Sequence, residues 1–102
     1  MKIALCCAAG MSTSLVVERM KKAAAERGLD AEIAAYGEPL VQKGLAETPD
    51  ILLLGPQVRY LLSKMKALYE PKGTRVAVID TRDYGMVNGA NILQSALKLL
   101  DE

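Results

Sequence analysis

The sequence predicts an α/β protein, a single three-layer domain in which helices cover both faces of a four-stranded parallel sheet. Short apolar runs typical of strands alternate four times with longer runs of helical periodicity, as in parallel sheets with right-handed crossovers. The 102 residues also contain no linker or break in composition. We therefore expect one domain over residues 1–102.

The first half of the chain predicts two strands and two helices. Residues 3–6 form a continuous apolar run, as in a strand covered on both faces, and residues 13–27 have helical periodicity that ends at Gly28. The apolar positions of this helix lie on one face, and they are Val16, Met20, Ala23 and Ala24. Residues 30–36 alternate in the manner of an edge strand, and residues 38–44 fit a short helix with proline in its first turn.

The second half predicts two more strands and two more helices. Residues 51–54 are the most hydrophobic run and indicate a central strand, after which residues 55–57 turn the chain into a helix. This helix ends at residues 71–73 and has an apolar stripe of Val58, Leu61, Leu62, Met65 and Leu68. Residues 76–79 form the fourth strand, followed by a polar loop. The apolar positions of the final helix are Ile92, Leu93, Ala96, Leu97 and Leu100.

Charge and composition exclude several classes of function. The formal net charge of +1 gives no electrostatic basis for binding nucleic acid or an anionic membrane, so we expect no nucleic-acid partner. The chain has no histidine, which excludes a Ser-His or Cys-His catalytic pair. Its two cysteines are adjacent, so we expect neither a metal site nor a cofactor. Because no stretch approaches the roughly 20 apolar residues of a membrane span and no export-type cleavage pattern is present, we expect a cytoplasmic protein.

Cys7 is the most informative residue for function. It follows an apolar strand and precedes a helix, where successive backbone N–H groups and the helix dipole favour bound anions. The same field favours the thiolate form of a cysteine, which is the nucleophile. We therefore predict that a phosphoryl group is carried on Cys7. The predicted phosphate-binding loop consists of Ala8, Ala9, Gly10, Met11, Ser12, Thr13 and Ser14.

Several other residues allow two interpretations. The three hydroxyl side chains of the loop either donate to phosphate or thiolate, or cap the helix. Gln57 either reaches the phosphate across the sheet edge or simply begins a helix. Asp80 and Tyr84 lie on the polar loop after the fourth strand, where an acid either supplies a proton or, more commonly, forms a turn. Met11 is a candidate for partner contact, whereas Cys6 is expected to be a buried hydrophobe, because neighbouring strand residues face opposite sides.

Three stretches carry a resemblance to a known family. Residues 7–14 read Cys-Ala-Ala-Gly-Met-Ser-Thr-Ser, residues 52–57 read Leu-Leu-Leu-Gly-Pro-Gln, and Ile79-Asp80 is followed by Tyr84-Gly85. Over essentially its whole length the chain resembles the IIB components of the lactose/cellobiose (chitobiose) class of the bacterial phosphoenolpyruvate-dependent sugar phosphotransferase system. The resemblance implies a sheet of strand order 2-1-3-4, similar in outline to low-molecular-weight tyrosine phosphatases.

The same resemblance implies a role in a phosphoryl relay. A IIA partner donates phosphate from its phosphohistidine to Cys7, and the membrane-embedded IIC partner presents a sugar hydroxyl that accepts it during uptake. The acceptor is expected to be a β-linked disaccharide. The protein is expected to be a monomer that associates transiently with the inner face of the membrane through IIC.

Two alternatives remain beside the carrier. The first is a cysteine phosphatase of the low-molecular-weight type, in which five residues separate the cysteine from an arginine that stabilises the transition state. Here that interval ends at Thr13, so the arginine is missing and hydrolysis should be poor. The second is a thiol redox module, which the adjacency of Cys6 and Cys7 disfavours because redox pairs usually have two residues between them.

Overall fold

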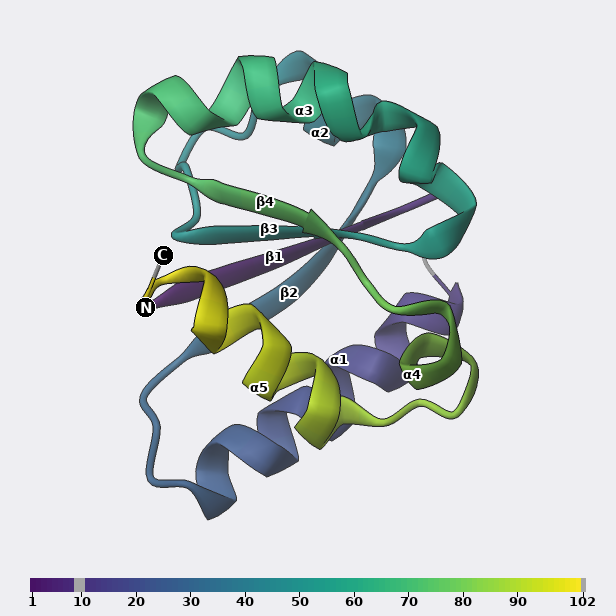
Figure 1. Ribbon diagram of the computed structural model, residues 1–102, viewed down its shortest axis with the longest axis vertical. Coiled ribbons are helices and arrows are strands. Elements are labelled where there is room, and N and C mark those ends of the chain that lie inside the picture. Colours follow the sequence, from purple (N-terminus) through teal and green to yellow (C-terminus); the bar gives the residue numbers. More distant parts are fainter. Residues whose placement is uncertain (9–10, 102) are drawn as a thin grey trace.

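Four parallel strands form a sheet between two layers of helices in the computed structural model, which describes residues 1–8 and 11–101 (Figure 1). The strands are β1 (Lys2–Cys7), β2 (Glu32–Gly37), β3 (Ile51–Leu54) and β4 (Arg75–Val78). Their order across the sheet is β2-β1-β3-β4, and all three pairings are parallel. The fold class and the strand order are therefore confirmed, with β2 at an edge as the alternation of its residues indicated.

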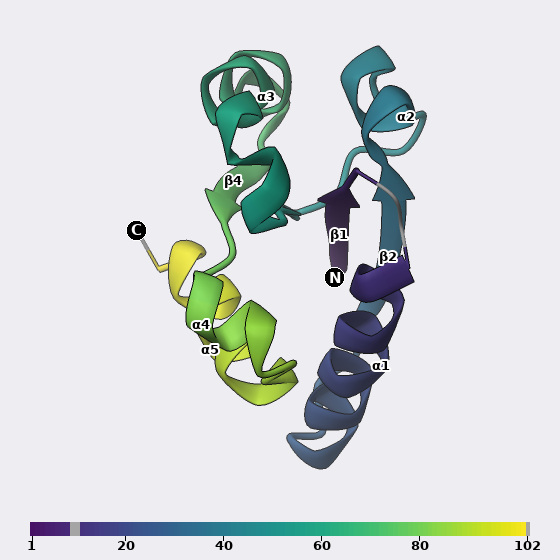
Figure 2. The same cartoon turned by 90° about the vertical axis from the view of Figure 1, so that its right-hand side faces the viewer.

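The helices divide between the two faces of the sheet (Figure 2). One face is covered by α1 (Met11–Glu26), α4 (Thr81–Gly85) and α5 (Gly89–Leu99). The other face is covered by α2 (Glu38–Lys43) and α3 (Leu62–Tyr69), and α3 is flanked by the 3-10 segments η1 (Pro56–Leu61) and η2 (Glu70–Lys72). No helix in the described part of the chain is both long enough and apolar enough to cross a bilayer.

Three local predictions differ from the structure. The helix predicted from residue 13 begins at Met11. The stripe predicted as one helix is split, because Val58 has non-helical angles (φ −114°, ψ 22°) and the chain forms η1 before α3. The segment after the fourth strand, predicted as a loop, contains α4, a helix of only 5 residues that is too short to show helical periodicity.

Alternation along β1 divides the core into two clusters. Ile3 and Leu5 belong to the cluster on the α1 and α5 face, whereas Ala4 and Cys6 belong to the cluster on the α2 and α3 face. The helical methionines predicted as core residues, Met20 and Met65, are both fully buried. The sheet is thus covered on both sides, which fits the continuous apolar runs of β1 and β3.

Tyr69 links the end of α3 to α2 through the interior. Its side chain is fully buried, and its hydroxyl donates to the carbonyl oxygen of Val41 at 2.8 Å and accepts from the N–H of Leu45 at 3.0 Å. Two buried backbone groups therefore depend on one phenol oxygen, and the loss of either bond leaves a polar group unpaired away from water.

Gly89 sets the contact between α1 and α5. A Cβ at this position would lie 2.4 Å from the carbonyl carbon of Arg19 and 2.5 Å from the backbone nitrogen of Met20. Those are backbone atoms of α1 and have little freedom to move. Only a residue without a side chain allows α5 to start this close to α1.

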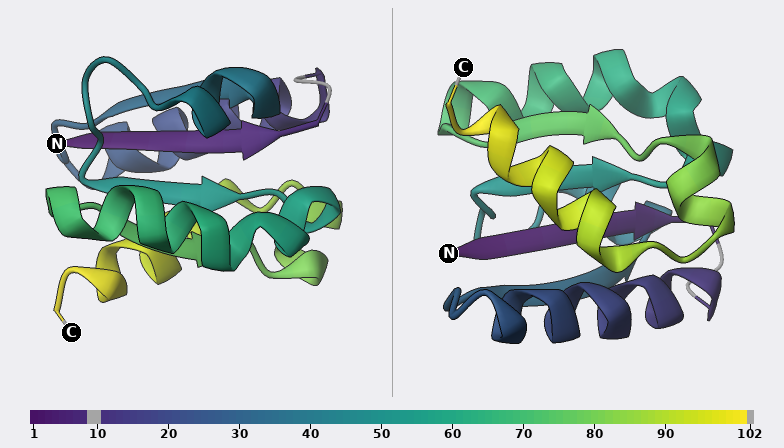
Figure 3. Two further views of the ribbon diagram at one scale, coloured as in Figure 1. Left: turned by 90° about the horizontal axis from the view of Figure 1, so that it is seen from above. Right: turned by 60° about the horizontal axis from the view of Figure 1, so that its bottom comes forward.

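All four strands point their carboxyl ends toward one edge of the sheet (Figure 3). The end of β1, the start of α1, the start of η1 and helix α4 all lie at this edge. Ligands of open parallel sheets bind beyond the carboxyl ends of the strands, so this edge is where a functional site is expected.

Candidate active site

Cys7 is the last residue of β1 and lies at the carboxyl edge of the sheet, where it is 2% exposed. Both neighbouring strands place a glycine beside it. Gly37 of β2 pairs with Cys7, and Gly55 directly follows Leu54, the β3 partner of Cys6. The N–H of Gly55 donates to the carbonyl oxygen of Cys6 at 2.9 Å, which continues the ladder one residue past β3. On each side of Cys7, the neighbouring residue across the sheet is therefore a glycine, which has no side chain.

The two adjacent cysteines have different environments, and neither belongs to a disulfide in the described chain. Cys6 is fully buried in the cluster on the α2 and α3 face, as expected from the sequence. Burial, and to a smaller extent the charges of Cys7 and Glu38, raises the pKa of Cys6 to about 11. Cys6 therefore keeps its proton near neutral pH, and a protonated thiol is a poor nucleophile.

The predicted phosphate-binding loop is described only in part. Ala9 and Gly10 lie outside the described residues, and only the backbone of Met11 and Ser12 is described. Ala8 is an exposed bend after β1, and α1 already begins at Met11. The last four residues of the predicted loop thus form the first turn of α1. The N–H groups of a first turn have no intrahelical partner, so they remain suited to hold an anion.

Two hydroxyl residues of this first turn are described, and they differ in burial. Ser14 is exposed, whereas Thr13 is fully buried. The Thr13 Oγ1 atom has no hydrogen-bond partner among the residues that the structure describes. Of the two interpretations for these hydroxyls, helix capping therefore does not apply to Thr13 in this structure.

Gln57 and Tyr84 converge on Gly55. A Cβ on Gly55 would lie 2.9 Å from Oε1 of Gln57 and 3.8 Å from Cε1 of the Tyr84 ring. Gln57 belongs to η1 and is exposed, whereas Tyr84 is buried within α4. Because Gly55 lies opposite Cys7, both predicted accessory residues lie at the same sheet edge as the cysteine. In the sequence, Gly55 stands out as part of a turn and of the stretch over residues 52–57, whereas nothing marks Gly37, although each glycine stands where a strand ends at this edge.

Asp80 has a structural role as the N-cap of α4. Its Oδ1 atom accepts from the N–H groups of Arg82 at 2.9 Å and Asp83 at 3.1 Å. Of the two interpretations for this acid, the structure favours local turn formation. The prediction of a loop was wrong for Thr81–Gly85, and the cap followed by α4 explains why an aspartate precedes this segment.

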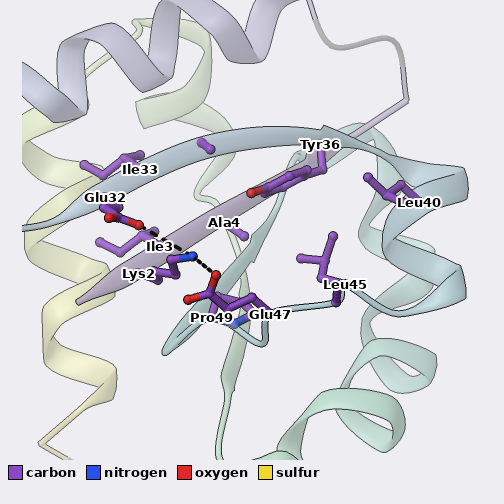
Figure 4. A pocket seen from close by; sticks show the side chains of 12 residues that line it. Lys2, Ile3, Ala4, Glu32, Ile33, Tyr36, Leu40, Leu45, Glu47 and Pro49 are labelled. Atoms are coloured by element: carbon purple, nitrogen blue, oxygen red, sulfur yellow. Dashed lines mark ion pairs between the residues drawn. The ribbon is translucent and has the colours of Figure 1, made fainter.

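A pocket of about 360 Å³ extends along β1 and β2, from Lys2 and Glu32 at the start of the strands to Tyr36, the strand partner of Cys6, and Leu40 of α2 (Figure 4). Its charged rim consists of Lys2, which forms ion pairs with Glu32 and Glu47, and its walls include Tyr36, Leu40 and Leu45. Lys2 and Glu32 begin β1 and β2, whereas Cys7 ends β1. Neither Cys7 nor Thr13 is among the residues that line the pocket. No group of three or more Cys, Asp or Glu side chains in the described residues is arranged to hold a metal ion.

Comparisons with known proteins agree with this geometry. Residues 2–95 match the family model described as the lactose/cellobiose-specific IIB subunit of the PTS system. The chain is 47% identical to the galactose-specific EIIB component of Lactococcus lactis subsp. cremoris (strain MG1363), over 97% of this chain and 95% of that protein. It is 46% identical, with the same coverage, to the cellobiose-specific EIIB component of Lactococcus lactis subsp. lactis (strain IL1403).

Solved structures give the same result for the fold. The lactose-specific IIB component domain of Streptococcus pneumoniae superposes with a TM-score of 0.83 over 96% of this chain and 95% of that one, at 18% identity. The cellobiose-specific IIB component of Borrelia burgdorferi has a TM-score of 0.76 over 99% of this chain and 92% of that one, at 37% identity. The YwlE mutant from Bacillus subtilis, which has a low-molecular-weight tyrosine phosphatase-like fold, matches with a TM-score of 0.54 over 99% and 98% of the two chains, at 16% identity.

Proposed function

The chain belongs to the lactose/cellobiose-specific IIB family of the sugar phosphotransferase system, and from this membership we propose that it carries a phosphoryl group on Cys7. One observation supports Cys7 above all. It lies where β1 leads into the amino end of α1, while the pKa of the adjacent Cys6 is raised to about 11. A thiol at a helix amino end combines a nucleophile with donors for the incoming phosphate.

The proposed relay consists of two displacements at one sulfur. In the first, the Cys7 thiolate attacks the phosphorus of a phosphohistidine on the IIA partner. The sulfur–phosphorus bond forms, the phosphorus–nitrogen bond breaks, and the imidazole nitrogen keeps the electron pair. In the second, a sugar hydroxyl presented by the IIC partner attacks the phosphorus. The oxygen–phosphorus bond forms, the sulfur leaves as thiolate, and the hydroxyl proton passes to a base of the IIC partner.

Within this proposal the loop from Ala8 to Ser14 holds the phosphoryl group through its backbone N–H groups. Gln57 and Tyr84, which lie beside Gly55 just after the end of β3, are the proposed accessory side chains. Because the Asp80 carboxylate already binds the first turn of α4, we assign it no part in the transfer.

The residues after Cys7 favour a carrier over a phosphatase. The first arginine beyond this cysteine is Arg19, well past the five-residue interval that phosphatases of this type use, and no lysine lies between Cys7 and Arg19. Without a guanidinium on the equatorial oxygens, the transition state for attack by water lacks its main stabiliser. A carrier benefits from slow hydrolysis, since its phosphocysteine must last until the sugar arrives.

The acceptor, location and oligomeric state of the protein also belong to the proposal. The galactose-specific and cellobiose-specific relatives are 47% and 46% identical to this chain, so overall identity does not select a sugar. We propose a β-linked disaccharide as acceptor, a cytoplasmic location with transient association to the membrane through IIC, and a monomeric protein.

Intact-mass spectrometry tests the proposal. The protein is incubated with phosphoenolpyruvate and the general phosphotransfer proteins, with a matched IIA protein either present or omitted. We expect a single added phosphate that requires IIA, is absent from Cys7→Ser and is retained in the matched control Cys6→Ala. Hydrolysis of p-nitrophenyl phosphate by the same samples should be negligible. Phosphate uptake by Cys7→Ser would disprove the assignment, and Cys7-dependent hydrolysis without phosphate uptake would favour the phosphatase.

A further inference from the structure

The Thr13 hydroxyl is a buried polar group without a partner. The residue is fully buried, and Oγ1 makes no hydrogen bond to any residue that the structure describes. Burying an unpaired hydroxyl costs free energy, and nearly all buried polar groups in folded proteins are paired. The other fully enclosed threonine of the described chain, Thr74, follows this rule, since its hydroxyl donates to the carbonyl oxygen of Pro49 at 2.7 Å. The exception at Thr13 therefore requires an explanation.

The position of Thr13 relates it to Cys7. Thr13 continues the buried face of α1 by one turn beyond Val16, and Val16 packs in the cluster that also contains Leu5 of β1. Side chains of a strand alternate, so Cys7 points to the same face of the sheet as Leu5. Because α1 begins at the edge where β1 ends (Figure 3), Thr13 in the first turn of α1 and Cys7 at the end of β1 lie on the same face of the sheet at the same edge.

We propose that the Thr13 hydroxyl donates a hydrogen bond to the phosphoryl group on Cys7, and that it stays unpaired until that group arrives. The proposal rests on the proposed function. Two independent features support it, namely the unpaired buried donor and the amino end of the 16-residue helix α1, which favours an anion at the same place.

The chemical type of the donor fits a carrier. Counted from Cys7, Thr13 stands at the position that the arginine occupies in phosphatases of the low-molecular-weight type. A neutral hydroxyl binds a phosphoryl oxygen but adds no positive charge to an attacking-water transition state. Thr13 would thus hold the phosphoryl group without promoting its loss to water.

Two matched variants separate this role from a structural one. Thr13→Val keeps the shape of the side chain and removes the hydroxyl, and Thr74→Val makes the same change at the partnered threonine. The equilibrium of phosphoryl exchange between the IIA protein and this chain is measured by intact mass, together with urea unfolding of the unphosphorylated proteins. Thr13→Ser, which retains a hydroxyl, serves as a second variant at the site.

We expect Thr13→Val to shift the exchange equilibrium toward the IIA protein by about tenfold or more, the usual effect of losing one hydrogen bond to a charged group. Its urea midpoint should not fall, because no native hydrogen bond is lost. Thr74→Val should show the reverse, with a lower midpoint and an unchanged equilibrium, and Thr13→Ser should remain close to wild type. An unchanged equilibrium in Thr13→Val would overturn the proposal, and so would a midpoint that falls as it does in Thr74→Val.

Failure of the proposed function would appear differently, as wild-type protein that takes up no phosphate from IIA. Inorganic phosphate is then titrated into wild type and Thr13→Val and followed by NMR of the backbone amides of α1. Binding to wild type that is weakened in Thr13→Val would support the hydroxyl as a donor to a free phosphate. Absence of binding, or equal binding to both proteins, would refute it.

Discussion

Alkaline pH should destabilise the folded protein through Cys6. The pKa of this thiol is raised from 9.0 to about 11, first by burial and then by the charges of Cys7 and Glu38. Since the folded-state value lies above the unfolded one, the unfolded chain loses this proton first. The contribution of Cys6 to stability is therefore complete below about pH 9 and is lost as the pH rises toward about 11.

The size of the effect can be worked out from the two pKa values. A difference of about two pKa units corresponds to about 3 kcal/mol when the titration is complete, and about 1 kcal/mol is already lost at about pH 10. Other groups of the protein titrate in the same range. The charge of Cys6 also contributes to the raised pKa values of Tyr60 and Tyr69. The difference between wild type and Cys6→Ala, which keeps the apolar character of the site, therefore measures the thiol together with its coupling to these groups.

Urea unfolding of wild type and Cys6→Ala at a series of pH values measures this difference. We expect the stability of wild type relative to Cys6→Ala to be constant below about pH 8 and to be lower by about 1 kcal/mol at about pH 10. In a Cys7→Ser background the fall should be smaller, because one of the two neighbouring charges is gone. A relative stability that does not change with pH would refute the conclusion that the buried Cys6 is held in its protonated form.

Two further predictions concern packing. Gly89→Ala should lower the free energy of unfolding by about 2 kcal/mol or more in urea, because its Cβ would lie 2.4 Å from a backbone atom of Arg19. Gly85→Ala in α4 is the control, since nothing lies within 4 Å of its Cβ; equal stability of the two variants would contradict the contact between α1 and α5. Tyr69→Phe should cost about 2 kcal/mol by leaving two buried backbone groups unpaired, and calorimetry showing no loss would mean that water replaces the hydroxyl.

The layered fold could be predicted from local pattern because each layer has its own periodicity. Continuous apolar runs for β1 and β3 and alternation for β2 are properties of neighbouring residues, and they indicated strands within a residue or two of their true ends. The helix over Thr81–Gly85 was missed because one and a half turns contain too few apolar positions to show a period. The break at Val58 was missed because an apolar stripe does not distinguish a 3-10 segment from an α-helix.

The sequence by itself determined which residue is the candidate nucleophile, since the strand, Cys7 and the helix after it are consecutive in the chain. Only the tertiary structure decided what surrounds that residue. It placed Gly37 and Gly55 on either side of Cys7, brought Gln57 and Tyr84 to Gly55, and enclosed the Thr13 hydroxyl with no partner among the residues that the structure describes. The physical reason is that strand register, close approach of backbones and burial of a polar atom are contacts between segments far apart in sequence, and no local periodicity encodes them.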